Sequence, residues 1–144
     1  MEFNRLIPSL KVSDITKSLE FYTKILGFKI EYERQEEKFV FLSYQGSQLM
    51  VGETGAGKDW ITAPLEAPLG RGINFQIETD NLSVLLEALQ VANYPLFAQV
   101  HEKWYREVNI LNGNRQFLVQ DPDGYLLRFF EDLGTKPAST PSSS

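Results

Sequence analysis

Apolar and polar residues alternate near the start of the chain and again near its middle. Leu6, Pro8, Leu10 and Val12 occupy every second position. Side chains of a strand point alternately to opposite faces, so residues 6–12 are predicted to form a strand with one apolar face. Residues 72–77 repeat the pattern, with apolar side chains at Ile73, Phe75 and Ile77.

A helix is predicted after each alternating segment. Asp14 is a capping residue ahead of residues 15–26, which carry apolar side chains at helical spacing, and Gly27 ends that helix. In the second half Asp80 is the expected cap, and the apolar stripe of the helix consists of Leu82, Leu85, Leu86 and Leu89.

Three strands are predicted after each helix. They cover residues 28–33, 38–44 and 48–51 in the first half, and residues 93–99, 116–120 and 125–130 in the second. The chain therefore reads as two β-α-β-β-β units and belongs to the α+β class. Placing Leu10 on Phe75 gives an offset of 65, and placing Gly46 on Gly124 gives 78. The difference of 13 indicates an insertion in the second unit, at the polar stretch 101–115.

A single packed domain is expected over residues 1–134. Its first module covers about residues 5–54, a Gly- and Pro-rich linker covers 55–70, and the second module covers 71–133. Residues 135–144 contain two prolines and no large apolar side chain, which predicts a disordered tail.

Composition narrows the function classes. A net charge of −5 and a pI near 4.9 argue against nucleic-acid binding, and fit either a cationic ligand or a merely soluble surface. The chain has no cysteine, no apolar run long enough for a bilayer and no secretory leader, so a cytoplasmic location without membrane contact is expected.

A phosphate-loop pattern, Gly-x-x-x-x-Gly-Lys, occurs at residues 52–58. Such a loop needs Ser or Thr next, to bind Mg²⁺, and a helix to present its amides. Asp59 follows instead, and Pro64 and Pro68 prevent a long helix. We interpret this stretch as part of the linker.

Polar residues on the strand faces opposite the helices are candidates to line a concave site. They are Ser9, Gln48, Asn74, Gln76 and Arg128, with Met50 among them. The amides suit an amide-rich ligand or an internal hydrogen-bond network. Arg128 suits either an internal carboxylate or an anionic ligand group. The single histidine, His101, is expected in a surface loop.

The opening IPSLKVSDITKSLEFYTKILGF and the closing FLVQDPDGYLLRFFED, with the paired units between them, resemble the vicinal oxygen chelate superfamily of glyoxalases, bleomycin-resistance proteins and dioxygenases. The resemblance covers residues 6–132 and implies an open, cup-shaped mixed sheet made by the two modules. At the positions where the metalloenzymes carry ligands, this chain has Ile7, Met50, Gly72 and Arg128. These side chains do not suit a metal, so no metal or other cofactor is expected.

Trp104-Tyr105-Arg106-Glu107 is similar to the Trp-x-Arg-Glu segment of bleomycin-resistance proteins, which bind their drug without metal. The resemblance implies that Trp104 stacks on a planar ligand in a groove between two subunits of a homodimer, with Trp60 and Phe41 as candidate walls. We therefore expect a protein that sequesters a bulky, partly aromatic, cationic antibiotic-like molecule and performs no catalysis. The alternatives are an enzyme acting on an anionic substrate through Arg128 with Glu107 or His101, and a ligand sensor.

Overall fold

The computed structural model describes residues 1–138, and these form two four-stranded sheets. In the first module the sheet order is β1-β4-β3-β2, and in the second it is β5-β8-β7-β6. The first-module elements are β1 (Ser9–Val12), α1 (Ile15–Leu19), η1 (Glu20–Ile25), β2 (Lys29–Arg34), η2 (Gln35–Glu37), β3 (Phe39–Tyr44) and β4 (Ser47–Glu53). The second-module elements are β5 (Asn74–Glu78), α2 (Leu82–Val91), β6 (Ala98–Glu107), β7 (Ile110–Gln120) and β8 (Leu126–Pro137).

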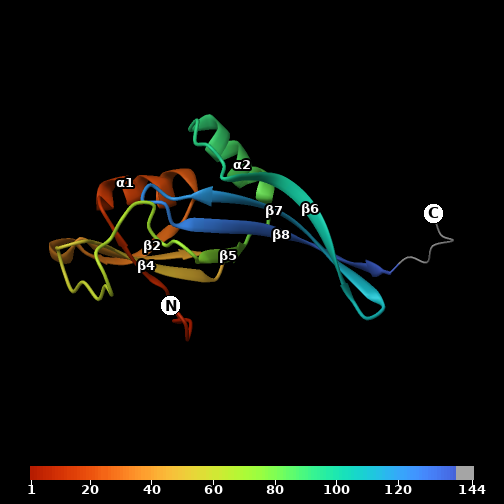
Figure 1. The fold of residues 1–144 in the computed structure, drawn as a ribbon, viewed down its shortest axis with the longest axis horizontal. Coiled ribbons are helices and arrows are strands. Elements are labelled where there is room, and N and C mark those ends of the chain that lie inside the picture. Colours follow the sequence, from red (N-terminus) through yellow and green to blue (C-terminus); the bar gives the residue numbers. More distant parts are fainter. Residues whose placement is uncertain (139–144) are drawn as a thin grey trace.

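The two modules repeat one topology, which confirms the predicted α+β class and the paired β-α-β-β-β units. In each sheet the first strand runs parallel to the last, as β1 does to β4 and β5 to β8, while the other pairs are antiparallel. The helices lie along one side of the two sheets, and the N-terminal segment extends from the opposite side (Figure 1).

The helix of the first module has two parts. Asp14 caps α1 by accepting hydrogen bonds from the backbone N–H groups of Thr16 and Lys17. The continuation, η1, is a π-helix, and Gly27 follows with φ of 85°. The apolar stripe predicted for one regular helix is thus spread over an α-helical and a π-helical turn. Within residues 1–138 neither helix is long and apolar enough to cross a membrane.

The helix caps correct the alignment of the two modules. Asn81, not Asp80, caps α2, because its side chain accepts the Ser83 N–H. Asp14 and Asn81 stand 67 positions apart, whereas the positive-φ turn residues Gly46 and Gly124 stand 78 apart. The second module is therefore longer by 11 residues rather than 13.

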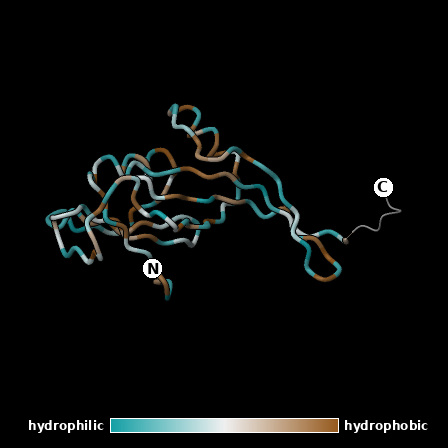
Figure 2. Tube along the Cα trace, in the orientation of Figure 1, coloured by the Kyte–Doolittle hydropathy of each residue, from teal (hydrophilic) through white to brown (hydrophobic). Residues whose placement is uncertain are grey.

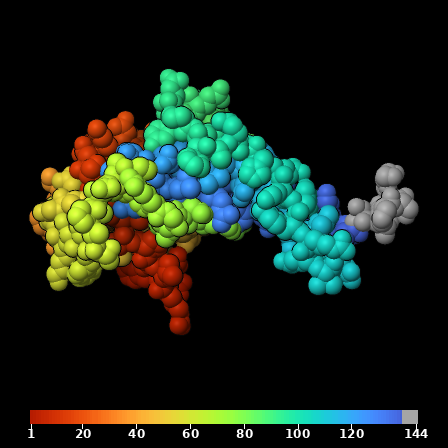
Figure 3. Space-filling view, viewed as in Figure 1, coloured from red at the N-terminus to blue at the C-terminus, as the bar shows by residue number. Residues whose placement is uncertain are grey.

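The sequence predicted that the additional residues form a loop. In the structure they lengthen two strands instead. β6 and β7 have 10 and 11 residues, against 6 each in β2 and β3. With the end of β8 they form an arm that projects from the body of the protein (Figures 1 and 3). β8 reaches Pro137, which pairs with Ile110, so residues 135–137 of the predicted tail are strand. Ala138 follows the strand, and residues 139–144 of that tail lie outside the described residues.

One core joins the modules. It contains Val12 and Tyr22 from the first module and Leu85 and Phe129 from the second, all at most 2% exposed. Apolar segments cluster in the body, while much of β6 is hydrophilic (Figure 2). Leu6, predicted to lie on the buried face, is 80% exposed because β1 begins only at Ser9.

The Asp-Pro-Asp-Gly turn before β8 also connects the modules. The Asp123 carboxylate accepts the Ser13 N–H, and the Tyr125 hydroxyl donates to the Lys11 carbonyl at 2.8 Å. Both bonds reach the end of β1, and they hold that strand in place beside the second module.

Candidate functional site

A cavity of about 560 Å³ lies on the face of the first sheet that the helices do not cover, and the linker closes one side of it. This volume is within the range of small-molecule sites. We call it the Trp60 pocket. Its lining residues are Ser9, Lys11, Tyr32, Arg34, Glu37, Phe39, Met50, Gly52, Gly57, Lys58 and Trp60.

Strand alternation places the aromatic wall of this pocket. Tyr32 and Arg34 are two positions apart on β2, so both point to the same face, and Arg34 pairs with Phe39 across the ladder. The Tyr32 ring stacks on Phe41 with centroids 5.1 Å apart. The Arg34 guanidinium lies 5.1 Å from the Phe39 centroid and 5.8 Å from that of Tyr32, at cation–π distance.

The linker is held over β1 by Asp59. Its carboxylate lies 3.1 Å from the Lys11 ammonium and accepts the Gly55 N–H at 2.8 Å. The Gly55 N–H bond and the Lys11 charge hold the pKa of Asp59 below its usual range. Because the Gly55 N–H is bonded to Asp59, it is not presented to a phosphate, which agrees with the interpretation of this stretch as a linker.

Trp60 stands at the rim of the pocket with 85% of its surface exposed. The Lys58 ammonium lies 5.7 Å from the centroid of its ring. An indole is a large apolar surface to leave in water, and such residues are enriched at binding sites. The ring is therefore available to contact a ligand.

The local charge differs from that of the whole chain. Lys11, Arg34 and Lys58 face the pocket together with Glu37, and Asp59 neutralises Lys11. The pocket thus has three cations against two carboxylates, while the chain carries −5 overall. This arrangement does not favour the cationic ligand that the resemblance to bleomycin-resistance proteins implies.

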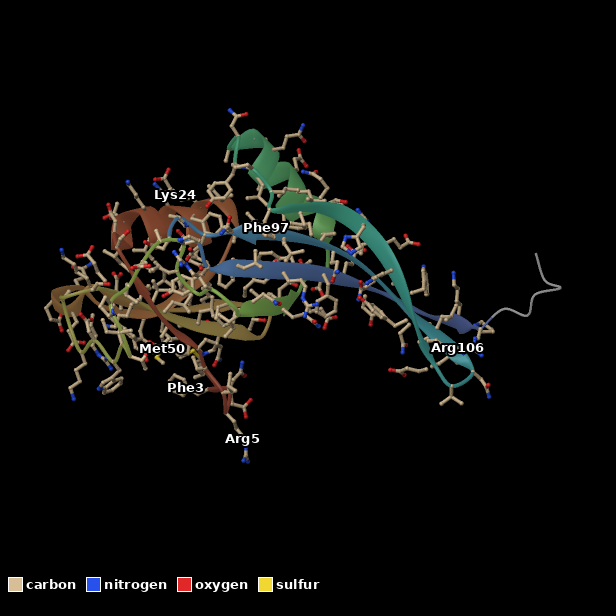
Figure 4. The ribbon with its side chains drawn as sticks, viewed as in Figure 1. Phe3, Arg5, Lys24, Met50, Phe97 and Arg106 are labelled. Carbon is tan, nitrogen blue, oxygen red and sulfur yellow. The ribbon has the colours of Figure 1, made fainter. Side chains whose placement is uncertain are left out.

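The structure brings three of the sequence-predicted site residues together, since Ser9, Met50 and Trp60 all line the pocket. Ser9 and Met50 are register partners on β1 and β4. Phe41 is only 1% exposed and lies beneath Tyr32 and Phe3, so it supports the wall rather than forming it. Met50 and Phe3 lie on the side of the sheet opposite Lys24 and its helix (Figure 4).

Gln48 has a structural role. Its amide accepts the Asn4 N–H and donates to the Glu2 carbonyl, both at 2.7 Å. These bonds tie the N-terminal segment to β4. The expectation of an internal hydrogen-bond network therefore describes Gln48 better than contact with a ligand does.

Asn74, Gln76 and Arg128 lie on the second sheet, away from the Trp60 pocket. Arg128 donates to the Gln76 side-chain oxygen at 2.7 Å. Within residues 1–138 no carboxylate forms an ion pair with Arg128, and its Nε is buried without a partner. Of the two alternatives for this arginine, the internal ion pair is not observed.

Trp104 lies on β6, in the arm, rather than in a loop. Its ring covers Gly113 so closely that a Cβ built there would lie 2.5 Å from it, and the Lys136 ammonium is 3.9 Å from the ring centroid. The indole N–H donates to Glu102. Nearby, His101 is also on β6, not in a loop, and its Nε2 lies 3.0 Å from the Gln116 amide.

The positions that correspond to metal ligands do not fit a metal. With the modules aligned through their helix caps, Asn74 rather than Gly72 corresponds to Ile7, and Met50 and Arg128 complete the set. An aliphatic group, an amide, a thioether and a guanidinium are poor donors for Zn²⁺ or Fe²⁺. Across residues 1–138 no three His, Asp or Glu side chains are grouped to hold an ion.

The sequence interpretation missed Tyr32, Arg34, Phe39 and Lys58 as pocket residues. A signal was present, because Tyr32 and Arg34 alternate on a predicted strand and Phe39 begins the next one. Their grouping depends on the cross-strand register, including the shift between Ile30 and Tyr32, which a single strand does not reveal.

The chain belongs to the Glyoxalase/Bleomycin resistance protein/Dioxygenase superfamily, whose sequence profile matches residues 5–129. It is 26% identical over 137 residues to a bleomycin resistance protein of Geobacillus stearothermophilus, covering 88% of this chain and 96% of that one. It is also 26% identical over 133 residues to a lactoylglutathione lyase of Haemophilus influenzae, covering 88% and 91%. The crystal structure of TioX from Micromonospora sp. ML1 shares the fold, with a TM-score of 0.69, 18% identity and coverage of 91% and 100%.

Proposed function

We propose that the protein binds and sequesters a bulky, partly aromatic small molecule, without a metal and without catalysis. The observation that carries the proposal is the Trp60 pocket, where an exposed indole and the aromatic residues Tyr32 and Phe39 line one cavity of ligand size. The similarity to bleomycin resistance proteins supports binding as the activity. The poor donor set at the ligand-equivalent positions supports the metal-free assignment.

We propose further that two copies of the chain complete the groove. Trp104 is on the arm and Trp60 is in the linker, at opposite ends of the protein (Figure 1). One ligand can therefore contact both indoles only if they come from different copies. The apolar tip of the arm, where Val108 is 84% and Ile110 41% exposed, is a suitable surface for such an association.

Calorimetric titration with metal-free bleomycin and a panel of aromatic antibiotics tests the binding function. Binding in the micromolar range, about −8 kcal/mol, is expected for at least one member. Trp60→Phe should weaken it, and Trp104→Phe should do so only in the dimer. If no compound binds at concentrations of about 100 μM, corresponding to about −5.5 kcal/mol, the proposal is wrong for this ligand class.

The similarity to a lactoylglutathione lyase favours one rival, an enzyme acting on a small anionic substrate. Arg128 would bind the substrate and His101, whose partner Gln116 pairs with Phe130, would transfer protons. Glu107, the other candidate from the sequence, pairs with Ile110 and through it with Pro137, nine positions from Arg128 along β8, so it is too far away to act on the same substrate. Elemental analysis of purified protein distinguishes the enzyme hypothesis from the sequestration hypothesis. A stoichiometric metal would support the enzyme, whereas its absence, together with no turnover across a pH series, supports sequestration.

A further inference from the structure

We infer that the ligand of the Trp60 pocket is a planar aromatic acid, an aromatic ring system carrying a carboxylate or a similar anionic group. This inference rests on the proposed binding function and specifies its ligand class. It follows from how the positive charges of the pocket are already paired and from which faces of the aromatic rings are already in contact.

The cations at the mouth of the pocket retain hydrogen-bond donors for an anion. Arg34 has one acidic partner, Glu37, at 3.6 Å, which is longer than a well-formed charge-assisted hydrogen bond, and both side chains are about half exposed. Lys58 forms no ion pair within residues 1–138. An anionic group between these two cations would complete their pairing.

The deeper cation, Lys11, differs from the two rim cations because it already forms a short ion pair. It is only 18% exposed and lies against Asp59, and its ammonium passes close to Gly52, where a Cβ would stand 3.5 Å away. Its charge is therefore compensated before any ligand arrives. Anion recognition is accordingly assigned to the rim residues Arg34 and Lys58, and Lys11 serves to position the linker.

The aromatic groups argue against a cationic ligand. A cation binds best over the face of an aromatic ring. In this pocket Arg34 already lies over Tyr32 and Phe39, and Lys58 lies over Trp60. A cationic ligand would have to displace the protein's own cations while being repelled by them, whereas a planar ring can stack on the free face of Trp60 with its acid beside Lys58.

Met50 provides the remaining contact. It is half-buried on β4, beside Ser9, and it lines the pocket with the aromatic wall. A thioether is polarisable and adapts to flat ring systems. The lining thus combines apolar side chains that can contact a flat ring system with two rim cations that can bind its anionic group.

The test compares three naphthalene derivatives of equal size that carry a carboxylate, a carboxamide or a methylammonium group. Calorimetry on the full chain should show the carboxylate binding about tenfold more tightly than the other two, a difference of about 1.4 kcal/mol. The preference should shrink when salt rises from about 20 to about 300 mM, because the rim cations are exposed to solvent.

Lys58→Gln and Arg34→Gln should each reduce the preference for the carboxylate and leave carboxamide binding within a factor of about three. Lys24→Gln makes the same charge change on the helix side of the sheet, where Lys24 forms no ion pair within residues 1–138, and should have no effect (Figure 4). Equal binding of the three probes, or tightest binding of the methylammonium, would overturn the inference and leave the binding function intact. Failure of all three to bind would instead count against the proposed pocket itself.

Discussion

Replacing Asp121 should change how the stability of the protein depends on pH. This carboxylate is 3% exposed and lies in the turn before β8. It accepts the Tyr22 hydroxyl at 2.8 Å and the backbone N–H groups of Asp123 and Tyr125 at 2.9 Å. Burial raises the pKa of Asp121 to about 6, and the three hydrogen bonds only partly oppose this effect.

The magnitude follows from the shift in pKa. The pKa of Asp121 rises from 3.8 to about 6. The folded protein therefore favours the protonated form of this side chain over the ionised form by about 3 kcal/mol more than the unfolded chain does. Because the folded-state pKa is the higher one, the folded protein holds this proton more tightly than the unfolded chain. The contribution of this bound proton to the free energy of unfolding is fully present below about pH 4. It falls as the pH rises through about 6 and is absent above about pH 7.

Urea unfolding of the wild type and Asp121→Asn, measured from about pH 4 to about pH 8, tests this reasoning. The amide does not titrate, so the wild type should lose about 2–3 kcal/mol relative to the variant across this range. Asp80→Asn, an exposed position, is the matched control and should follow the wild type. Parallel stability curves for the wild type and Asp121→Asn would refute the assigned pKa shift.

Three further changes have defined outcomes. Trp60→Ala should weaken binding of an aromatic ligand by about two- to tenfold, without lowering the melting temperature, because the ring is 85% exposed; a large drop in melting temperature would contradict its place at the rim. Gly70→Ala should lower the free energy of unfolding, measured in urea, by about 2 kcal/mol, because φ at this residue is +72° and its Cβ would lie 2.5 Å from the Tyr125 ring. Gly57→Ala, the control, should lower it by less than half as much, because a Cβ there would have only ordinary contacts at 3.8 Å. Trp104→Ala should speed amide hydrogen exchange in the arm and leave the body unchanged; unchanged exchange in the arm would show that the indole does not stabilise it.

Strands with one buried face could be predicted from the sequence, whereas the arm could not. In β1 and β5 the helix-facing positions are apolar and alternate with polar ones. This alternation is enough to predict a strand and which of its faces is buried. In β6, residues 101–103 and 105–107 are all exposed. A ribbon with solvent on both faces has no apolar period to detect, and its stability comes from ladder hydrogen bonds and from Trp104 covering Gly113.

Part of the lining of the Trp60 pocket could be predicted from the sequence. Ser9, Met50 and Trp60 could be selected because strand parity and an indole in a polar segment are visible in the sequence, and all three line this pocket. Whether they bind a ligand stays a prediction. The cations could not be placed, since Lys58 reaches the pocket through the fold of the linker and Arg34 through cross-strand register. Overall charge was a poor guide to local charge for the same reason.

Binding of an aromatic small molecule in the Trp60 pocket can be followed residue by residue. Nuclear magnetic resonance of the labelled protein, titrated with the naphthalene carboxylate, locates the binding site directly. If the ligand occupies the Trp60 pocket, saturable shifts are expected at Tyr32, Phe39 and the Trp60 indole N–H, with none at Lys24. Shifts confined to the arm, or none at all in the first sheet, would show that the ligand does not bind there.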